Sequence, residues 1–196
     1  MCCLILASQS AIRAELLQNA GIAYLAIAAN VDEDVIKQSM QGKNPEEVAL
    51  ALAEAKALKI SAKKLNNYVL GCDQILVFEQ EIFDKPKSIT EARAHLQRLR
   101  GQKHVLISAQ VVCLDGKTLW KNTQKAYLEM RGFSDDFLEN YLEQLGDCVC
   151  GSVGGYKIEG LGAQLFAAID GEQSTIQGLP IFPLMEFLRS QNILMS

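Results

Sequence analysis

The sequence predicts a mixed α/β fold, because strand-like apolar segments alternate with helical segments along most of the chain. Residues 104–130 contain two strand-like segments around the pair Asp115-Gly116, a strong hairpin signal that adds antiparallel pairing. The 196 residues, 49% of them hydrophobic, suffice for one domain with a full core, although the length alone also permits two small lobes. Because the sequence contains no repeat and no Pro/Gly/Ser-rich linker, we expect a single domain over residues 1–196.

The first part of the chain is expected to form a strand and two helices. A short strand covers residues 4–7, and the helix after it begins with Ser10 as N-cap and ends at Gly21. The second helix begins after Asn44, where a proline takes the first helical position and two glutamates suit the positive end of the helix dipole. It extends to about residue 65.

A buried strand over residues 69–78 begins the next part of the chain. Ser88 and Glu91 have the spacing of a capping box, and the helix that they start ends at Gly101. After the hairpin we expect a helix over residues 134–145, short strands around residues 154–160 and 164–171, and a last helix over residues 183–189.

The composition argues against several classes of protein. A net charge of -4, with 19 Lys and Arg residues, lacks the basic surface on which nucleic-acid binders depend. The six cysteines include no C-x-x-C pair and only two histidines accompany them, so we expect reduced thiols and no zinc site. The apolar run at the N-terminus is too short to span a bilayer and has no basic flank. We therefore expect a cytoplasmic protein without a membrane segment.

The strand "VLGCDQILVF" contains an unexpected pair of polar residues, Asp73 and Gln74. Alternation along a strand sends adjacent side chains to opposite faces, yet both faces of this strand are otherwise apolar. A carboxylate in such a place suggests a functional role.

Two clusters of polar residues could cooperate with Asp73. Ser8, Ser10 and Arg13 lie at a turn from strand to helix, which favours anions, although an ordinary serine cap with a surface arginine would look the same. Glu33 belongs to the acidic run "NVDED", which would be a solvated turn unless a second carboxylate helps it to hold a hard cation. Asp73 could be that second carboxylate.

Two lysines and a glycine-rich segment are further candidates. Lys56 lies on an apolar helical stripe, where its ammonium could enter a cleft or extend to solvent. Lys85 precedes a proline, in a geometry shared by phosphate-binding loops and surface loops. The five glycines within residues 151–162 would let the backbone approach a ligand closely, or would only form turns and a bulge.

The order of these motifs resembles that of the Maf family of nucleoside triphosphate pyrophosphatases over nearly the whole chain. The segments that carry the resemblance are "LILASQSAIRAELLQNAG", "VDE", "LALAEAKA", "VLGCDQIL", "DKPKSITEARAHLQRLRGQKH", "GSVGGYKIEGLGAQLFAAIDG" and "IQGLPIFPLMEFL". The resemblance implies an elongated, twisted, mixed sheet flanked by helices, in two lobes with a central cleft. It also implies a homodimer that hydrolyses the bond between the α and β phosphates of a nucleotide with Mg²⁺ or Mn²⁺.

The resemblance also implies roles for single residues. Ser8, Ser10 and Arg13 would bind phosphate, Asp73 would be the proton acceptor, and Glu33 and Asp73 would hold the metal. The lysines at the matching motif positions are Lys56 and Lys85, which would act with them in catalysis.

Departures from the family pattern concern the phosphate-binding motif and the base. The usual "SPRR" reads Ser10, Ala11, Ile12, Arg13 here, so that a proline and an arginine are replaced. Gln74 and Glu159 resemble the branch that acts on 7-methyl-GTP, and a carboxylate can accept two hydrogen bonds from a guanine. With Ile12 they are the expected base-selecting residues. The alternatives are a pyrophosphatase directed at dTTP or UTP, and a weakly catalytic nucleotide-binding regulator of cell division.

Overall fold

The computed structural model describes residues 4–195. Its seven strands form one sheet in the order β2-β1-β3-β5-β6-β7, with β4 paired to β3. The bounds of the strands are β1 Leu4–Leu6, β2 Tyr24–Ala26, β3 Tyr68–Phe78, β4 Glu81–Phe83, β5 Lys103–Leu114, β6 Lys117–Met130 and β7 Phe166–Asp170. Strand β1 pairs in parallel with β2 and β3, whereas β4 and β7 pair antiparallel with their neighbours. The predicted mixed α/β class is confirmed.

Seven α-helices accompany the sheet in the part of the chain that the structure describes. Their bounds are α1 Ala11–Asn19, α2 Glu33–Ser39, α3 Pro45–Ser61, α4 Ile89–Leu99, α5 Asp135–Leu145, α6 Gln173–Ile176 and α7 Ile181–Ser190. The chain divides into two compact units. Unit 1 comprises residues 1–74, 107–124 and 173–196, and unit 2 comprises residues 75–106 and 125–172.

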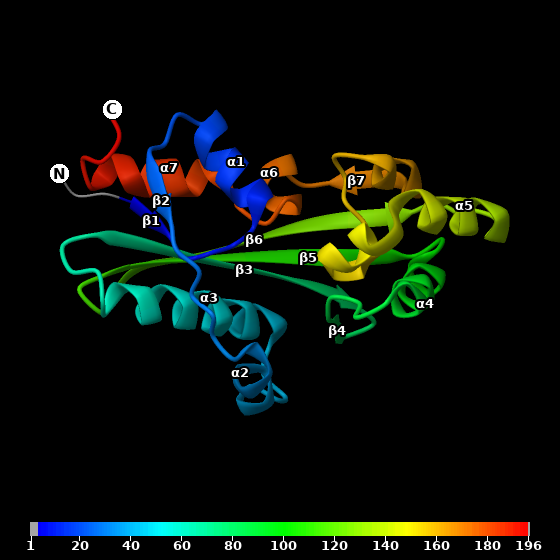
Figure 1. Cartoon of the computed structure of the whole chain (residues 1–196), viewed down its shortest axis with the longest axis horizontal. Coiled ribbons are helices and arrows are strands. Elements are labelled where there is room, and N and C mark those ends of the chain that lie inside the picture. Colours follow the sequence, from blue (N-terminus) through cyan, green and yellow to red (C-terminus); the bar gives the residue numbers. More distant parts are fainter. Residues whose placement is uncertain (1–3, 196) are drawn as a thin grey trace. The chain divides into compact units, whose positions relative to one another are not determined.

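Helices lie on both faces of the sheet in unit 1: α3 on one face, and α1 with α7 on the other (Figure 1). The two faces of β3 follow from strict alternation. Leu70 and Cys72 point into a buried apolar cluster with Leu17 of α1 and Leu184 of α7. Gly71, between them, faces α3. Both faces of this strand are therefore buried, as its apolar composition predicts.

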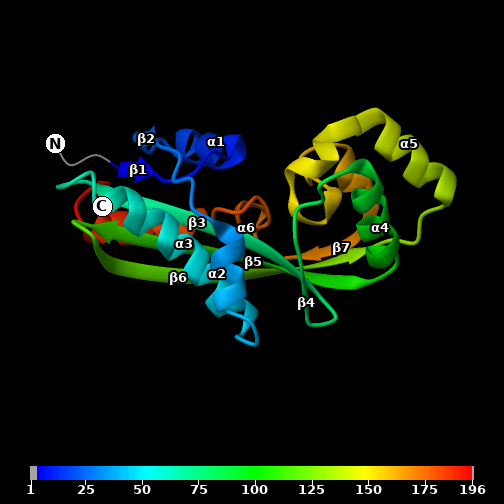
Figure 2. The same cartoon turned by 60° about the horizontal axis from the view of Figure 1, so that its bottom comes forward.

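Unit 2 is built around α4, α5 and three short 3-10 helices, Gly146–Gly151, Val153–Gly155 and Leu161–Leu165. Figure 2 shows α5 and the yellow 3-10 segments lying together beside α4. The ring of His104 on β5 lies edge-on to Tyr156, whose ring also packs edge-on against Phe166 of β7. These aromatic contacts form part of the interior of this unit.

The element predictions were largely correct at the caps. Asn44 caps α3 as predicted, and it forms a full capping box with Glu47. At the predicted capping box, the Ser88 hydroxyl accepts a hydrogen bond from the Glu91 N–H, but the Glu91 carboxylate accepts from the N–H of Lys87 and not from that of Ser88. The Ser10 side chain makes no cap hydrogen bond, although Ser10 holds the N-cap position. The helix predicted to reach residue 65 ends at Ser61, before a polar stretch with no apolar face to bury.

One predicted strand is wrong. Residues 154–160 form 3-10 and turn structure, because their closely spaced glycines favour turns over a ladder of strand hydrogen bonds. Several short elements were not predicted, among them α2, β4 and α6, each of seven residues or fewer. None of the helices between residues 4 and 195 combines the length and the apolar composition that a membrane crossing requires.

Candidate active site

The turn between β1 and α1 lies beside the middle of β3. Leu6 is the last β1 residue in register with β3, where it pairs with Leu70, so β3 continues past the end of β1. The turn is organised by Ser8, whose hydroxyl accepts a hydrogen bond from the Ser10 N–H at 3.2 Å. This compact turn leads into α1 next to the residues of β3 that precede Asp73.

Arg13 of α1 is held by three acceptors. Its Nε donates to the carbonyl of Gly178 at 2.9 Å, and its Nη1 donates to the carbonyl of Cys72 at 3.0 Å and to the Ser8 hydroxyl at 3.4 Å. Among the residues that the structure describes, these three bonds use Nε and Nη1, and none of them uses Nη2. The guanidinium is therefore fixed on one edge and offers its remaining donors to an anion.

Asp73 and Glu33 share the ammonium of Lys56. The Lys56 Nζ lies 2.6 Å from Asp73 Oδ1 and 2.7 Å from Glu33 Oε1. The Asp73 and Lys56 side chains are only 9% and 13% exposed, whereas Glu33 is 43% exposed. One buried cation thus joins a buried carboxylate to one at the surface.

Burial has a clear electrostatic effect on Asp73. Desolvation raises the pKa of this carboxyl above its usual range, and the charges of Lys56 and Arg13 oppose the rise. Glu33 raises the pKa slightly further as a like charge. A carboxylate with an elevated pKa is better suited to accept a proton than an exposed aspartate.

Gly71 brings Lys56 within reach of Asp73. A Cβ atom at Gly71 would lie 2.1 Å from the carbonyl oxygen of Ala53 and 2.8 Å from the nitrogen of Ala57, both on α3. The helix can therefore approach β3 this closely only because residue 71 has no side chain. Lys56 is three residues after Ala53 on the same helix. From there its ammonium reaches Asp73, which lies two positions after Gly71 on β3.

The three acids of "NVDED" have different environments. Asp32 caps α2 by accepting a hydrogen bond from the Val35 N–H at 3.1 Å, Glu33 contacts Lys56, and Asp34 is exposed. The run therefore begins a helix and does not form a turn. Its helical start points Glu33 towards α3, with which α2 packs.

The donor set around Asp73 fits a hard divalent cation in its chemistry. Between residues 4 and 195, no group of three or more His, Cys, Asp or Glu side chains could hold a metal ion. Mg²⁺, however, is usually bound by one or two carboxylates with substrate phosphates and water, and Asp73 and Glu33 provide two. Only Oδ1 of Asp73 takes part in the contact with Lys56, which leaves a second oxygen on this carboxylate.

Gln74 points away from Asp73, as alternation predicts. Asp73 contacts α3, whereas the Gln74 Nε2 lies 3.0 Å and 2.9 Å from the carbonyls of Thr175 and Ile176 on α6. The amide also donates to the Ser108 hydroxyl at 3.0 Å. The structure therefore does not place Gln74 beside Asp73, and both of its amide hydrogens have acceptors within the protein.

The other expected residues belong to different places. Ile12 is half-buried next to Arg13 on α1. Lys85 and Glu159 lie in unit 2, Lys85 in the exposed loop after β4. The structure thus brings together Ser8, Arg13, Glu33, Lys56 and Asp73 in unit 1. Lys85 and Glu159 belong to unit 2.

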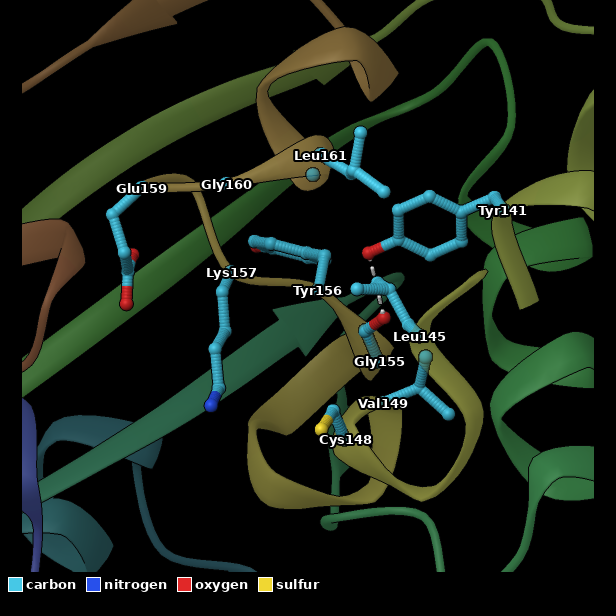
Figure 3. A pocket seen from close by; sticks show the side chains of 11 residues that line it. Tyr141, Leu145, Cys148, Val149, Gly155, Tyr156, Lys157, Glu159, Gly160 and Leu161 are labelled. Carbon is cyan, nitrogen blue, oxygen red and sulfur yellow. Dashed lines mark hydrogen bonds between the residues drawn. The ribbon is translucent and has the colours of Figure 1, made fainter. Parts of the chain in front are cut away.

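Glu159 lines a pocket of about 210 Å³ in unit 2. Figure 3 shows Glu159 and Lys157 on one side of this pocket and Tyr141 with Leu161 on the other. The Tyr141 hydroxyl donates to the Gly155 carbonyl at 3.3 Å. The complete lining is Tyr141, Leu145, Cys148, Val149, Gly155, Tyr156, Lys157, Glu159, Gly160, Leu161 and Gly162. Mostly apolar walls with a small number of polar or charged groups are typical of small-molecule sites.

Sequence reasoning missed the backbone groups that hold the site together. The carbonyls of Cys72 and Gly178 bind Arg13, and no side-chain pattern could reveal them. Gly178 stands in the motif "IQGLP", and its φ of +87° is one that side chains rarely adopt. That glycine was the available signal.

Comparisons with known proteins point to one family. The profile of a family described as Maf-like protein matches residues 3–191. A nucleoside triphosphate pyrophosphatase of Paramagnetospirillum magneticum is 47% identical over 186 residues, which are 94% of this chain and 96% of that protein. A 7-methyl-GTP pyrophosphatase of Brucella abortus is 44% identical over 190 residues, 96% of each chain. A nucleoside triphosphate pyrophosphatase of Rhodospirillum rubrum is 45% identical over 194 residues, 98% of this chain and 96% of that protein.

Proposed function

This chain belongs to the Maf-like protein family, and from that premise we propose that it is a nucleoside triphosphate pyrophosphatase, a hydrolase that acts on an acid anhydride. Its substrate would be cleaved between the α and β phosphates to give a nucleoside monophosphate and pyrophosphate. The observation that carries this proposal is the buried carboxylate of Asp73, held by Lys56 beside the Ser8–Arg13 turn. A protein that only bound nucleotides would not need a proton acceptor there.

The cations of the site suit the charge of the substrate. A triphosphate carries about four negative charges near neutral pH, so attack by water requires positive charge around the phosphates. Arg13 provides a guanidinium whose position is fixed by backbone carbonyls, and Lys56 provides a buried ammonium. By its motif position, Lys85 would add a third cation. We expect these groups to bind and neutralise the phosphate chain.

Asp73 would orient the attacking water and accept its proton. Burial raises the pKa of its carboxyl, which favours acceptance of a proton, while Lys56 keeps the carboxylate ionised before the reaction. Glu33 contacts the same ammonium and would keep Lys56 in place. A divalent cation held by Asp73 and Glu33 would supply further positive charge to the phosphates.

We propose that the base is guanine-like and that Glu159 reads it. The support is the position of Glu159 at a pocket whose volume suits a nucleobase and whose walls include the Tyr141 ring. A carboxylate can accept hydrogen bonds from both the N1–H and the exocyclic amine of guanine. One of the similar proteins above is a 7-methyl-GTP pyrophosphatase, which is consistent with such a base.

Pyrophosphate release from GTP, 7-methyl-GTP, dTTP and UTP tests this function. We expect the guanine nucleotides to have the highest kcat/KM. The Glu159→Gln variant should lose about 10- to 100-fold of this preference over dTTP and UTP. Equal preference in both enzymes would remove Glu159 from base recognition. A wild-type preference for dTTP or UTP would refute the guanine assignment, and no release from any triphosphate would refute the activity.

Removal of divalent metal should abolish this activity. Addition of EDTA is expected to stop pyrophosphate release, and Mg²⁺ or Mn²⁺ in excess should restore it. Glu33→Gln removes one of the two carboxylates and should raise the metal concentration at half-maximal rate. Asp34→Asn, which changes an exposed acid of the same helix, is the matched control and should leave that concentration unchanged. Full activity in EDTA would contradict the metal assignment.

A further inference from the structure

Lys157 and Glu159 bring opposite charges to the pocket of unit 2. Both side chains are exposed and line the pocket, and only Ile158 separates them in the chain. Figure 3 shows them on the same side of the pocket. Among the residues that the structure describes, neither charged group takes part in an ion pair or a hydrogen bond, with the other or with a third group. The ammonium and the carboxylate are therefore both available to a ligand.

The Lys157 ammonium lies beside one wall of this pocket. A Cβ atom at Gly151 would lie 3.8 Å from the Lys157 Nζ, so the ammonium lies over the end of the 3-10 helix Gly146–Gly151. The same helix supplies Cys148 and Val149 to the pocket. In this largely apolar lining, Lys157 thus provides a localised group of hydrogen-bond donors.

The backbone that carries the two charges is held in place. The Ser152 hydroxyl donates to the Tyr156 carbonyl at 2.5 Å, directly before Lys157. A Cβ atom at Gly162 would lie 2.3 Å from the Lys157 carbonyl oxygen, so the backbone closes on itself around residues 157–162. Because the segment is already ordered, a ligand that binds its side chains has a smaller entropic cost to offset.

The two charges match neighbouring atoms of guanine. The N1–H and the exocyclic amine of this base are donors, and a carboxylate can accept from both. The O6 atom beside N1 is an acceptor, which lysine binds well because an ammonium has only donors. Adenine has an amine in place of O6, and an ammonium would repel it. A carboxylate alone would leave O6 without a donor.

We propose that Lys157 is a specificity-determining residue that donates to O6 of guanine, while Glu159 accepts from N1–H and the amine. This inference rests on the proposed function, which places the base in the pocket of Glu159. It assigns each charged residue to different atoms of the base. Analogues that change one of these atoms at a time can therefore separate the two residues.

The test compares GTP with two analogues. ITP lacks the exocyclic amine, and 6-thio-GTP has sulfur, a weak acceptor, in place of O6. The variants are Lys157→Met, Lys157→Arg and Glu159→Gln, and kcat/KM for pyrophosphate release is measured with each nucleotide. Lys103→Met is the matched control, because Lys103 is an exposed lysine of unit 2 that contacts Glu129 and does not line the pocket.

We expect wild type to prefer GTP over 6-thio-GTP and over ITP by about tenfold each, since each analogue loses a hydrogen bond to a charged group. Lys157→Met should abolish the preference over 6-thio-GTP and keep the preference over ITP. Glu159→Gln should do the reverse. Lys157→Arg retains a cationic donor and should keep both preferences, and Lys103→Met should behave as wild type.

Three results would overturn the proposal. The first is a wild type that does not distinguish GTP from 6-thio-GTP. The second is a preference over 6-thio-GTP that survives in Lys157→Met. The third is an equal loss of kcat/KM in Lys157→Met for all three nucleotides, which would mean that the ammonium acts on the phosphates or on the fold.

Binding of the monophosphates separates this inference from the proposed function. A wild type that releases no pyrophosphate from any triphosphate would refute the proposed activity. Calorimetry with GMP, IMP and 6-thio-GMP requires no turnover, so it would still decide whether Lys157 recognises O6. The same pattern of preferences in wild type and in Lys157→Met is expected in these dissociation constants, and its absence would overturn the role of Lys157.

Discussion

Asp73 is an ionisable residue whose neighbours on β3 are almost all apolar and buried. Its environment is defined by opposing effects: burial disfavours the charge, and Lys56 and Arg13 favour it. Replacement of its carboxylate by an amide keeps the shape and removes the ability to accept a proton. The consequences can be measured separately for folding and for turnover.

Asp73→Asn should fold normally and lose at least about 100-fold in kcat, the usual contribution of a general base. Lys56 still contacts Glu33 in this variant, so that its charge is not left without a partner. Thermal unfolding would check the fold, and steady-state kinetics would give kcat. Turnover close to that of wild type would exclude Asp73 as the proton acceptor.

Lys56→Met should shift the acidic limb of the pH profile of kcat/KM to higher pH. Lys56 lowers the pKa of Asp73 by its charge and by its hydrogen bond, so its removal lets burial raise that pKa further. Because Asp73 must be deprotonated to accept a proton, activity then begins at a higher pH.

Lys59→Met is the control for that shift. Lys59 lies on the same helix, and its ammonium donates to the backbone carbonyl of Asn30 and not to a carboxylate in that bond. Its replacement should leave the acidic limb in place. A limb that moves to lower pH in Lys56→Met, or that moves equally in both variants, would contradict the electrostatic coupling.

The packing of α3 against β3 controls the distance between Lys56 and Asp73. Gly71→Ala should destabilise the protein by about 1 to 3 kcal/mol, because the added Cβ would overlap backbone atoms of Ala53 and Ala57. If α3 moves away to relieve this overlap, the contact of Lys56 with Asp73 is lost and kcat should fall as well. Chemical denaturation and kinetics would measure the two effects.

Gly132→Ala is the matched substitution. A Cβ atom at Gly132 would have no heavy atom within 4 Å, so we expect a change of less than about 0.5 kcal/mol and normal kcat. Equal stability of the two alanine variants would mean that α3 does not need its close approach.

The sequence predicts long elements with clear periodicity or caps better than short ones. The N-cap at Asn44 and the hairpin at Asp115-Gly116 are local chemistry, and both structures are present. The strand expected over residues 154–160 failed because its pattern of apolar residues is interrupted by glycines in turn conformations. Short elements such as α6 depend on tertiary contacts, here the bonds from Gln74 and Ser108, which no local pattern encodes.

For the site, motif order was more informative than any single residue. Arg13 and Asp73 are 60 positions apart on the printed chain, yet each was expected to contribute to one site, and the structure places Arg13 on the carbonyl next to Asp73. The backbone acceptors of Arg13 could not be predicted, since every residue has a carbonyl and only the fold selects two of them.

For the chain as a whole, the net charge of -4 does not describe how charged residues are grouped locally. Two of its cations, Arg13 and Lys56, lie around one buried carboxylate in unit 1. Unit 2 has a different buried ionisable group, His104, whose Nε2 lies 2.7 Å from the Tyr156 hydroxyl. Its Nδ1 is buried without a hydrogen-bond partner among the residues that the structure describes.

His104 should make the protein less stable as the pH falls. Burial lowers the pKa of this imidazole from 6.5 to about 4, so the unfolded chain binds a proton between these values that the folded chain excludes. The free energy of unfolding should therefore decrease from about pH 6.5 to about pH 4, by about 3 kcal/mol for this group.

His104→Gln removes that titration and retains a hydrogen-bonding side chain. Denaturation of both proteins at several pH values would give the difference in unfolding free energy. We expect this difference to change across the window in favour of the variant as the pH falls. A difference that stays constant would show that His104 does not titrate in this way.

The three hydrogen bonds of Arg13 have a consequence for the thermodynamics of binding. A free arginine side chain has about 2 kcal/mol of rotamer entropy, and an anion that ordered it would have to offset part of this loss. Here the backbone carbonyls of Cys72 and Gly178 already restrict the rotamers in the protein without ligand. The entropic cost of ordering the guanidinium is therefore part of the free energy of folding. It does not reduce the free energy of binding to the phosphates.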